Sequence, residues 1–185
     1  FIANTKEYKR VNHINYFRLL GGETAVKEPK RVALSLLFDN FTLEDILAMN
    51  IKCVKAFKPN EIKMLHTMWQ KALNSPLTSS VGRLFADILH TQSYEGETGL
   101  QIEQNYDALI TEFYSYKITN EKIDLTPMIK EIIFDSNKKL ICSKFINTLA
   151  QIILELANIY ENLPVVLSGG VFQNKILLQI LIVKF

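Results

Sequence analysis

Apolar residues recur every three or four positions along most of this chain, a spacing that places side chains on one face of an α-helix. The pattern predicts helices over 30–38, 42–49, 59–73, 81–90, 126–134 and 138–160, with a shorter one within 93–103. Pro29 suits the first turn of the first helix, because its missing N–H has no partner to lose there. Thr42 and Asp45 have the spacing of a capping box, which predicts where the second helix starts.

Three regions depart from the helical period. Residues 1–20 mix aromatic and basic side chains without a sustained period and are predicted to be irregular. Alternation within 112–125 around a polar turn predicts a β-hairpin. The apolar run 165–167 predicts a short buried strand that stops at Ser168. These elements together predict one α/β domain over 1–185, mostly helical with a few strands.

Two stretches carry apolar faces that should be buried. Within 59–73 the stripe that includes Met64, Met68 and Trp69 is predicted to be core. The last stretch, 175–185, is apolar on nearly every side. Because a helix of this kind is normally covered by other protein, we expect the chain to be a truncated domain from a longer protein.

Composition and charge limit the class of protein. A chain of 185 residues that is 48% apolar can bury the core of one globular domain. The net charge is +2 and no basic stripe is interleaved with aromatics, so nucleic acid is not predicted as a partner. Cys53 and Cys142 stand alone, which suits a reducing cytoplasm. No signal peptide and no apolar run near the ~18 residues of a membrane span are evident, so no membrane association is predicted.

The segment VVLSGGVFQNK holds the main candidate chemistry. Gly169 and Gly170 lack a Cβ and can take positive φ, so a ligand can approach the backbone closely. A helix that starts near Val171 or Phe172 would add free N–H groups and a partial positive charge, which suit a phosphate. Ser168 and Asn174 add a hydroxyl and an amide. The same pattern also fits an ordinary tight turn between a strand and a helix.

Two further motifs could line a ligand site. Gly21 and Gly22 precede Glu23, whose carboxylate could accept hydrogen bonds from ligand hydroxyls, although a turn before a helix explains the motif as well. Glu95 beside Gly96 offers an acceptor or a base, and an exposed polar loop is the alternative. The 3 histidines have no partner at metal-ligand spacing, so no metal site is predicted.

Five segments, taken in order, resemble the HypF family of carbamoyltransferases, which are maturation proteins of nickel–iron hydrogenases. They are GGETAVKEPKRVAL, NSPLTSSVGRLF, SYEGETGLQIE, IDLTPMIKEI and LSGGVFQNKILL. The resemblance covers nearly the whole chain and falls in the C-terminal region of that family. This region is similar to the universal tRNA threonylcarbamoyl transferases and has the sugar-kinase/actin-like fold, so the resemblance implies a partial carbamoyltransferase domain of that fold.

The resemblance also implies a reaction. HypF proteins take carbamoyl phosphate and ATP, form carbamoyl adenylate, and pass the carbamoyl group to the C-terminal cysteine of a HypE-type acceptor protein, where it becomes a cyanide ligand of the hydrogenase iron. Glu95 is assigned to catalysis near the reactive group. The residues assigned to ATP and carbamoyl adenylate are Gly21, Gly22, Glu23, Gly96, Ser168, Gly169, Gly170 and Asn174.

The chain also departs from the family pattern. Glu23 stands where the family usually has Asp, Ala86 where Asp often occurs, and Ile146 where His often occurs. The family's histidine-rich metal motif, its Asn-Asp-Gly-Gly segment and its acylphosphatase-like, zinc-finger and adenylate-forming modules do not occur in these residues. We therefore expect the family metal ion only in the complete domain, and negligible activity from this piece alone. The alternatives are a kinase-like phosphotransferase of the same fold and a non-catalytic partner-docking fragment.

Overall fold

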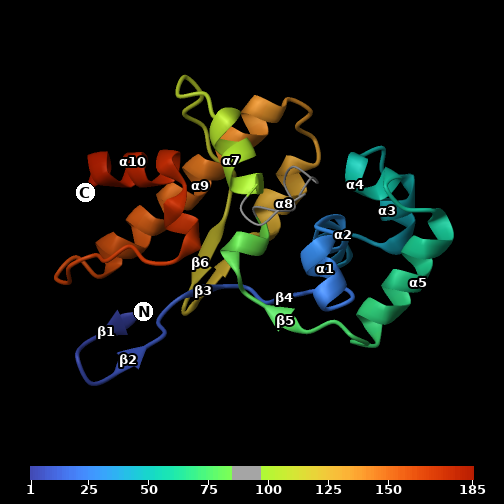
Figure 1. Ribbon diagram of the computed structural model, residues 1–185, viewed down its shortest axis with the longest axis horizontal. Helices are drawn as coiled ribbons and strands as arrows, with labels where there is room; N and C mark the ends of the chain where they lie inside the picture. Colours follow the sequence, from blue (N-terminus) through green and yellow to red (C-terminus); the bar gives the residue numbers. More distant parts are fainter. Residues whose placement is uncertain (85–96) are drawn as a thin grey trace.

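Helices dominate the architecture of the protein, whose structure is a computed structural model that describes residues 1–84 and 97–185 (Figure 1). The helices are α1 (Glu23–Lys27), α2 (Lys30–Phe38), α3 (Leu43–Ala48), α4 (Lys52–Lys55), α5 (Pro59–Gln70), α7 (Glu97–Gln104), α8 (Thr126–Ile132), α9 (Lys138–Ile159) and α10 (Lys175–Lys184), with a 3₁₀ turn η1 (Gly170–Gln173). Helices α2, α3, α5, α8 and α9 confirm the predicted periodicity. Residues 81–84 are helical, and the rest of the helix predicted over 81–90 lies outside the described residues.

The starts of α3 and α5 follow from their capping residues. In α3 the Thr42 hydroxyl accepts a hydrogen bond from the Asp45 amide at 3.2 Å, and the Asp45 carboxylate accepts one from the Thr42 amide at 3.3 Å. This is the predicted capping box. In α5, Pro59 occupies the first position and the Glu61 carboxylate accepts from the Lys58 amide at 2.7 Å. Both arrangements satisfy amides that a helix leaves without an intrahelical partner.

The strands are short, and several of them pair with remote segments. They are β1 (Ile2–Ala3), β2 (Tyr8–Lys9), β3 (His13–Ile14), β4 (Phe17–Arg18), β5 (Leu77–Thr78), β6 (Lys117–Thr119) and β7 (Lys122–Asp124). β6 and β7 form the predicted hairpin, and β3 joins it parallel to β7, with His13 opposite Lys122 and Ile14 opposite Ile123. β1 pairs with β2, and β4 pairs with β5, both antiparallel.

The prediction that residues 1–20 are irregular is wrong, because β1 to β4 all lie there. A strand of two residues is too short to show the alternation of apolar and polar positions that identifies a strand in a sequence. The partners of β3 and β4 are also distant in the chain, in β7 and β5 respectively. The hydrogen bonds that define these strands therefore leave no local signal.

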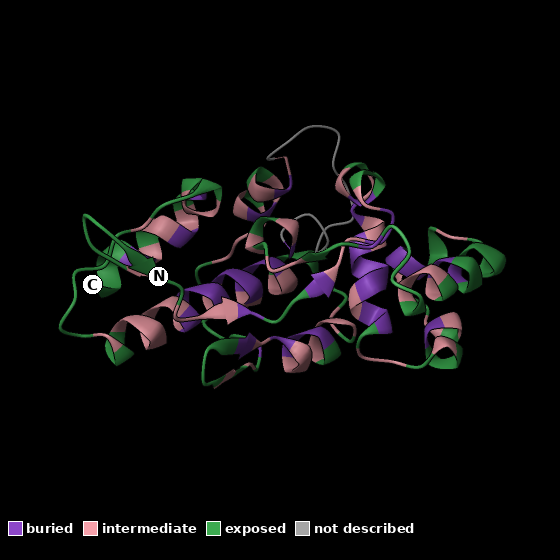
Figure 2. Ribbon diagram, turned by 90° about the horizontal axis from the view of Figure 1, so that it is seen from below, coloured by how far each residue is buried: buried purple, intermediate pink, exposed green. Residues whose placement is uncertain are grey.

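Two clusters of buried apolar side chains form the core, and α2 contributes to both. The larger cluster includes Phe145 and Leu149 of α9 and Leu177 and Leu181 of α10, and these two helices contact each other. In the smaller cluster, α2 packs against α3, α4 and α5, with Leu34 fully buried. Figure 2 shows the buried ribbon segments gathered in the middle of the molecule, with exposed segments at both ends. The two clusters place α2 and α9 at the centre of the fold.

The apolar stripe predicted on α5 is only partly buried. Ile62 and Leu65 are buried and Trp69 is half-buried against the smaller cluster, but Met64 is 57% exposed. Each helical residue turns by about 100°, so Met64 lies well away from the face that Ile62, Leu65 and Trp69 share. The prediction that Met64 belongs to the core is therefore wrong.

The buried strand predicted at 165–167 does not form. Val165 and Val166 are 46% and 83% exposed, and no described residue pairs with this run as a strand. A lone extended segment has no ladder of hydrogen bonds to hold it as a strand, whatever its composition. The helix that was expected to start near Val171 or Phe172 begins only at Lys175, after the 3₁₀ turn η1.

One helix differs from the expectation about membrane spans. By length and composition α9 could cross a bilayer, with 22 residues and a mean hydropathy of 1.5 over its most apolar window, so the statement that no apolar run approaches this length is wrong. Its Phe145, Ile146 and Leu149 side chains are buried in the larger core cluster, alongside α10. Such burial is typical of the central helix of a packed core, which can match a membrane span in length and hydropathy.

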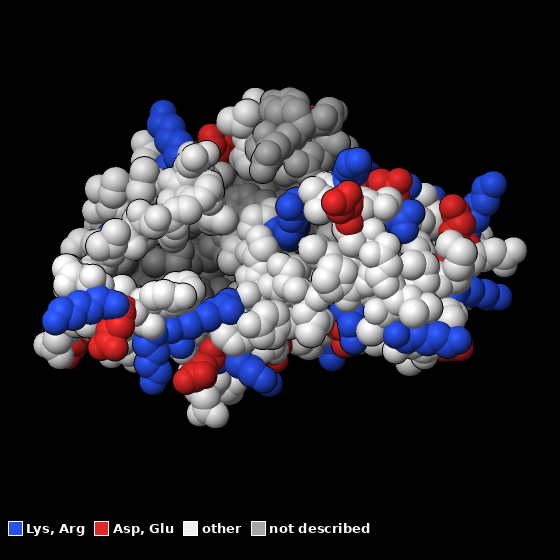
Figure 3. All heavy atoms as spheres, turned by 60° about the horizontal axis from the view of Figure 1, so that its bottom comes forward, with Lys and Arg blue, Asp and Glu red and all other residues white. Residues whose placement is uncertain are grey.

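The surface shows how charge and apolar residues are distributed. Figure 3 shows Lys and Arg interspersed with Asp and Glu over one face of the molecule, without a patch of a single sign. At the end of α10, Leu177 and Leu181 are buried whereas Ile182, Val183 and Phe185 are 66%, 84% and 57% exposed. One face of α10 is thus buried against α9, whereas apolar side chains at its C-terminal end remain exposed.

Candidate functional site

The glycine-rich loop between α9 and α10 is open. Gly169 has a φ of +99°, a conformation that side-chain-bearing residues rarely adopt. Both Gly169 and Gly170 are exposed, and no atom lies within 4 Å of where a Cβ would stand at either position. The Gly169 carbonyl accepts a hydrogen bond from the Phe172 amide at 3.1 Å, which closes the turn. A ligand therefore has free access to this stretch of backbone.

The amides of the same loop are available to a ligand. Those of Ser168, Gly169, Gly170 and Val171 donate no hydrogen bond to any residue that the structure describes. Successive unpaired N–H groups in a turn make a concave site that favours an anion. The expectation that the peptide amides of this bend are exposed is consistent with this geometry.

The first turn of α10 is occupied by the protein itself. Asn174 is buried, its Oδ1 accepts from the Leu177 amide at 3.0 Å, and its Nδ2 donates to the Gly99 carbonyl of α7 at 3.3 Å. The Lys175 amide donates to the carboxylate of Glu103, also in α7, at 2.5 Å. The helix therefore does not offer the free set of N–H groups that the sequence suggested. Asn174 serves as its N-cap, and its assignment to nucleotide binding stays a prediction.

The second glycine pair forms a closed turn. Gly21 has a φ of +92°, and its amide donates to the Asn74 carbonyl at 2.9 Å. Gly22 has a φ of +59°, and a Cβ there would lie 2.7 Å from Oδ1 of Asn74. Glu23 follows as the exposed first residue of α1. The glycines are thus required by the turn itself, whatever further role they have.

The two predicted glycine pairs lie apart in the structure. Figure 1 shows α1, which follows Gly21 and Gly22, well separated from α10, which follows the other glycine pair. Glu95 and Gly96 lie outside the described residues. The assignments to catalysis and nucleotide binding therefore stay predictions for the described part of the chain.

Replacing Gly22 by alanine should lower the free energy of unfolding by about 1–3 kcal/mol, because it adds backbone strain and forces Asn74 to move. Gly99→Ala is the matched control, since that glycine is helical and a Cβ there meets nothing within 4 Å. It should be neutral or stabilising by up to ~1 kcal/mol. Denaturant unfolding measures both, and equal effects would contradict the strain argument.

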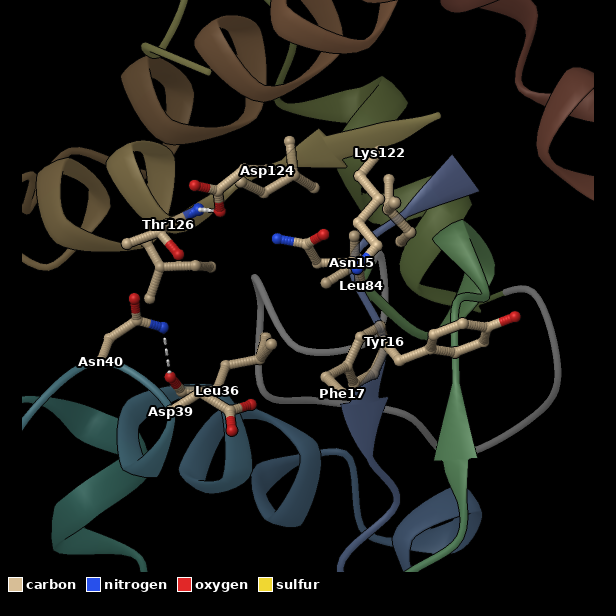
Figure 4. Close-up of a pocket in the computed structure, with 13 residues that line it drawn as sticks. Asn15, Tyr16, Phe17, Leu36, Asp39, Asn40, Leu84, Lys122, Asp124 and Thr126 are labelled. Carbon is tan, nitrogen blue, oxygen red and sulfur yellow. Dashed lines mark hydrogen bonds between the residues drawn. The ribbon is translucent and has the colours of Figure 1, made fainter. Parts of the chain in front are cut away.

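A cavity of about 410 Å³ lies between α2, the strands β3 and β7, and α8 (Figure 4). The polar side chains that line it are Asn15, Asp39, Asn40, Lys122, Asp124 and Thr126. Asn40 donates to the Leu36 carbonyl at 2.7 Å, and Asp124 accepts from the Thr126 amide at 2.9 Å. No sequence motif predicts this cavity, because the residues that line it come from segments far apart in the sequence.

One carboxyl in this cavity titrates unusually. Displacement of water by the surrounding protein raises the pKa of Asp39 to about 6, against the opposing influence of Trp69 and Arg18. Asp39 lies at the end of α2, and none of the described residues assigned to nucleotide binding lines the cavity. Within residues 1–84 and 97–185 no group of three or more His, Cys, Asp or Glu side chains is arranged to hold a metal ion.

Comparison with known families decides what this fold is. The profile of the carbamoyltransferase Kae1-like domain, second subdomain, of HypF matches residues 1–185. The chain belongs to this family. Carbamoyltransferase HypF of Synechocystis is 34% identical over 92% of this chain and 25% of its own length. The probable carbamoyltransferase HypF of Methanocaldococcus jannaschii is 26% identical over 92% of this chain and 24% of its own.

Solved HypF structures share the fold. A crystal structure of full-length HypF in its phosphate- and nucleotide-bound form superposes with a TM-score of 0.84 at 29% identity, over 98% of this chain and 30% of that one. HypF from T. kodakarensis gives a TM-score of 0.72 at 22% identity, over 94% of this chain and 26% of that one. The predicted mostly helical α/β carbamoyltransferase-domain fold is confirmed. The chain spans about a quarter of the length of the HypF relatives that it matches.

Proposed function

We propose that the protein containing this HypF subdomain is a carbamoyltransferase that uses carbamoyl phosphate and ATP. Family membership and the names of the relatives support the reaction class. The observation that carries the chain's own part is the open loop at Gly169 and Gly170, whose amides have no acceptor among the described residues. The relative solved with phosphate and nucleotide has the same fold over 98% of this chain.

In the proposed step, a cysteine thiolate of a HypE-type acceptor attacks the carbonyl carbon of carbamoyl adenylate. A C–S bond forms, the C–O bond to the phosphate breaks, and AMP leaves with the bonding electron pair. Negative charge grows on the carbonyl oxygen and on the leaving phosphate, and fixed N–H donors at those positions lower the barrier. The amides of Ser168 to Val171 are the donors that this chain offers to the phosphate.

Within 1–84 and 97–185 no group of three or more Asp, Glu, His or Cys side chains is arranged to hold a metal ion, so no step is assigned to a metal here.

One cysteine bears on the cellular compartment of the protein. Cys142 is buried, and burial raises the pKa of its thiol to about 11. A buried thiol that stays protonated suits a reducing compartment, and we propose the cytoplasm.

Incubating the full-length protein with carbamoyl phosphate, ATP and a HypE-type acceptor tests the proposal. Mass spectrometry should find one carbamoyl group on the acceptor's C-terminal cysteine and AMP as a product. Omitting ATP, or replacing that cysteine by serine, should remove the modification. Transfer of a phosphoryl group to a hydroxyl substrate would instead favour the kinase-like alternative. Acceptor binding without ATP consumption would favour the docking role.

A further inference from the structure

Helix α7 is joined to the start of α10 by two polar contacts that the reaction described above does not use. The Glu103 carboxylate accepts from the Lys175 amide at 2.5 Å, and the Gly99 carbonyl accepts from Asn174 Nδ2 at 3.3 Å. The partners lie 72 and 75 residues apart in the sequence. Both contacts end in the segment that immediately follows the glycine loop.

Apolar packing supports the same junction. Ile102 of α7 and Leu177 of α10 are both fully buried in the larger core cluster, and both helices contact α9. Glu103 is half-buried beside this contact. A carboxylate at a helix N-terminus is favoured by the partial positive charge there, and a hydrogen bond from an amide to a charged acceptor is stronger than a neutral one. Glu103 therefore holds α10 at a fixed place on α7.

We propose that Glu103 is a positioning residue for nucleotide binding. It fixes the first turn of α10 and thereby the orientation of the amides at 168–171, which lie just before η1 and in its first residues. The Glu103 carboxylate takes the Lys175 amide and Asn174 takes the Leu177 amide, so the loop offers a phosphate more open amides than the first turn of α10 does. The inference rests on the proposed function, because it gives Glu103 a role only if the loop receives the nucleotide.

The junction also links two motifs of the family resemblance. Glu103 and Gly99 belong to the segment SYEGETGLQIE, and Asn174 and Lys175 to LSGGVFQNKILL. The polar contacts tie the second motif to the helical part of the first, at α7. An error in the placement of α10 would therefore misalign the loop amides without unfolding either helix, and the KM for ATP should be sensitive to it.

Glu103→Ala in the full-length protein should raise the KM for ATP about tenfold, because a charge-assisted hydrogen bond that orders the loop is lost. Glu103→Gln keeps a carbonyl oxygen for the Lys175 amide and should stay within about threefold of the unmodified protein. The matched control is Gln104→Ala, since Gln104 is exposed on the same helix. Steady-state kinetics of carbamoyl transfer measures the three variants, and the thermal midpoint of each shows whether it is folded.

Three outcomes are distinguishable. A raised KM in Glu103→Ala, rescue by glutamine and an unchanged Gln104→Ala variant support the positioning role. An unchanged KM in a folded Glu103→Ala variant overturns it, and so does failure of glutamine to rescue. If the unmodified protein transfers no carbamoyl group at all, the proposed function fails first, and the loss is not specific to Glu103.

Discussion

Replacing Gly169 by valine in the full-length protein should lower carbamoyl transfer by roughly 10²-fold, the scale seen when a fixed donor for developing charge is removed. Gly169 has a φ of +99°, and valine reaches this region only with severe strain, so the loop has to change its path. The new path would turn the amides of Ser168, Gly170 and Val171 away from the bound phosphate. Transfer of the carbamoyl group to the acceptor cysteine measures the effect.

A substitution at the neighbouring glycine, Gly170→Ala, separates the effect of backbone strain from the effect of adding a side chain to the loop. Gly170 has no positive φ, and a Cβ there meets no atom within 4 Å, so Gly170→Ala leaves the turn unstrained. It should therefore reduce transfer less than Gly169→Val does. Hydrolysis of carbamoyl phosphate by the other modules that the family resemblance implies should not change in either variant. Full transfer by Gly169→Val would exclude this loop from the nucleotide site.

The elements that could be predicted are mainly those that a local sequence pattern marks. Helices α2, α3, α5, α8 and α9 were predictable because an apolar period of three to four residues, a proline or a capping box marks each of them. The hairpin β6–β7 was predictable from alternation around a polar turn. The run 165–167 also had a local signal, but its apolar residues are exposed and do not form a strand.

The candidate site shows the same limit. The Gly169–Gly170 pair correctly predicted the position of an open loop, since Gly169 has a positive φ and both glycines are exposed. The sequence could not reveal that α10 starts at Lys175 with Glu103 on its first amide, because that contact joins residues 72 positions apart. The cavity beside Asp39 escaped prediction for the same reason, since four separate segments line it. Spacing in the sequence carries information only within one element.

An irregular segment, 105–116, is held against α9 by polar bonds rather than by regular secondary structure. The Tyr114 amide donates to Thr148 Oγ1 at 2.8 Å, and the Tyr114 hydroxyl donates to the Asp135 carboxylate at 2.8 Å. Lys144 Nζ of α9 lies 2.9 Å from the same carboxylate oxygen and 4.1 Å from the centre of the Tyr114 ring. Burial, with Asp135 adding to it, raises the pKa of Tyr114 well above its usual range, so the hydroxyl remains a donor.

Asp135→Ala should therefore lower the free energy of unfolding by about 2–3 kcal/mol, because it leaves a buried hydroxyl and a mostly buried ammonium without their acceptor. Asp135→Asn keeps an acceptor for Tyr114 but removes the charge that faces Lys144, and a loss of about 1 kcal/mol is expected. Hydrogen exchange of the α9 amides in the full-length protein measures the free energy of opening for this region.

Glu161→Ala, at an exposed position just after α9, serves as the control and should stay within about 0.5 kcal/mol. Equal protection of α9 in Asp135→Ala and Glu161→Ala would show that packing of Phe145 and Leu149, rather than the Asp135 contacts, fixes the segment.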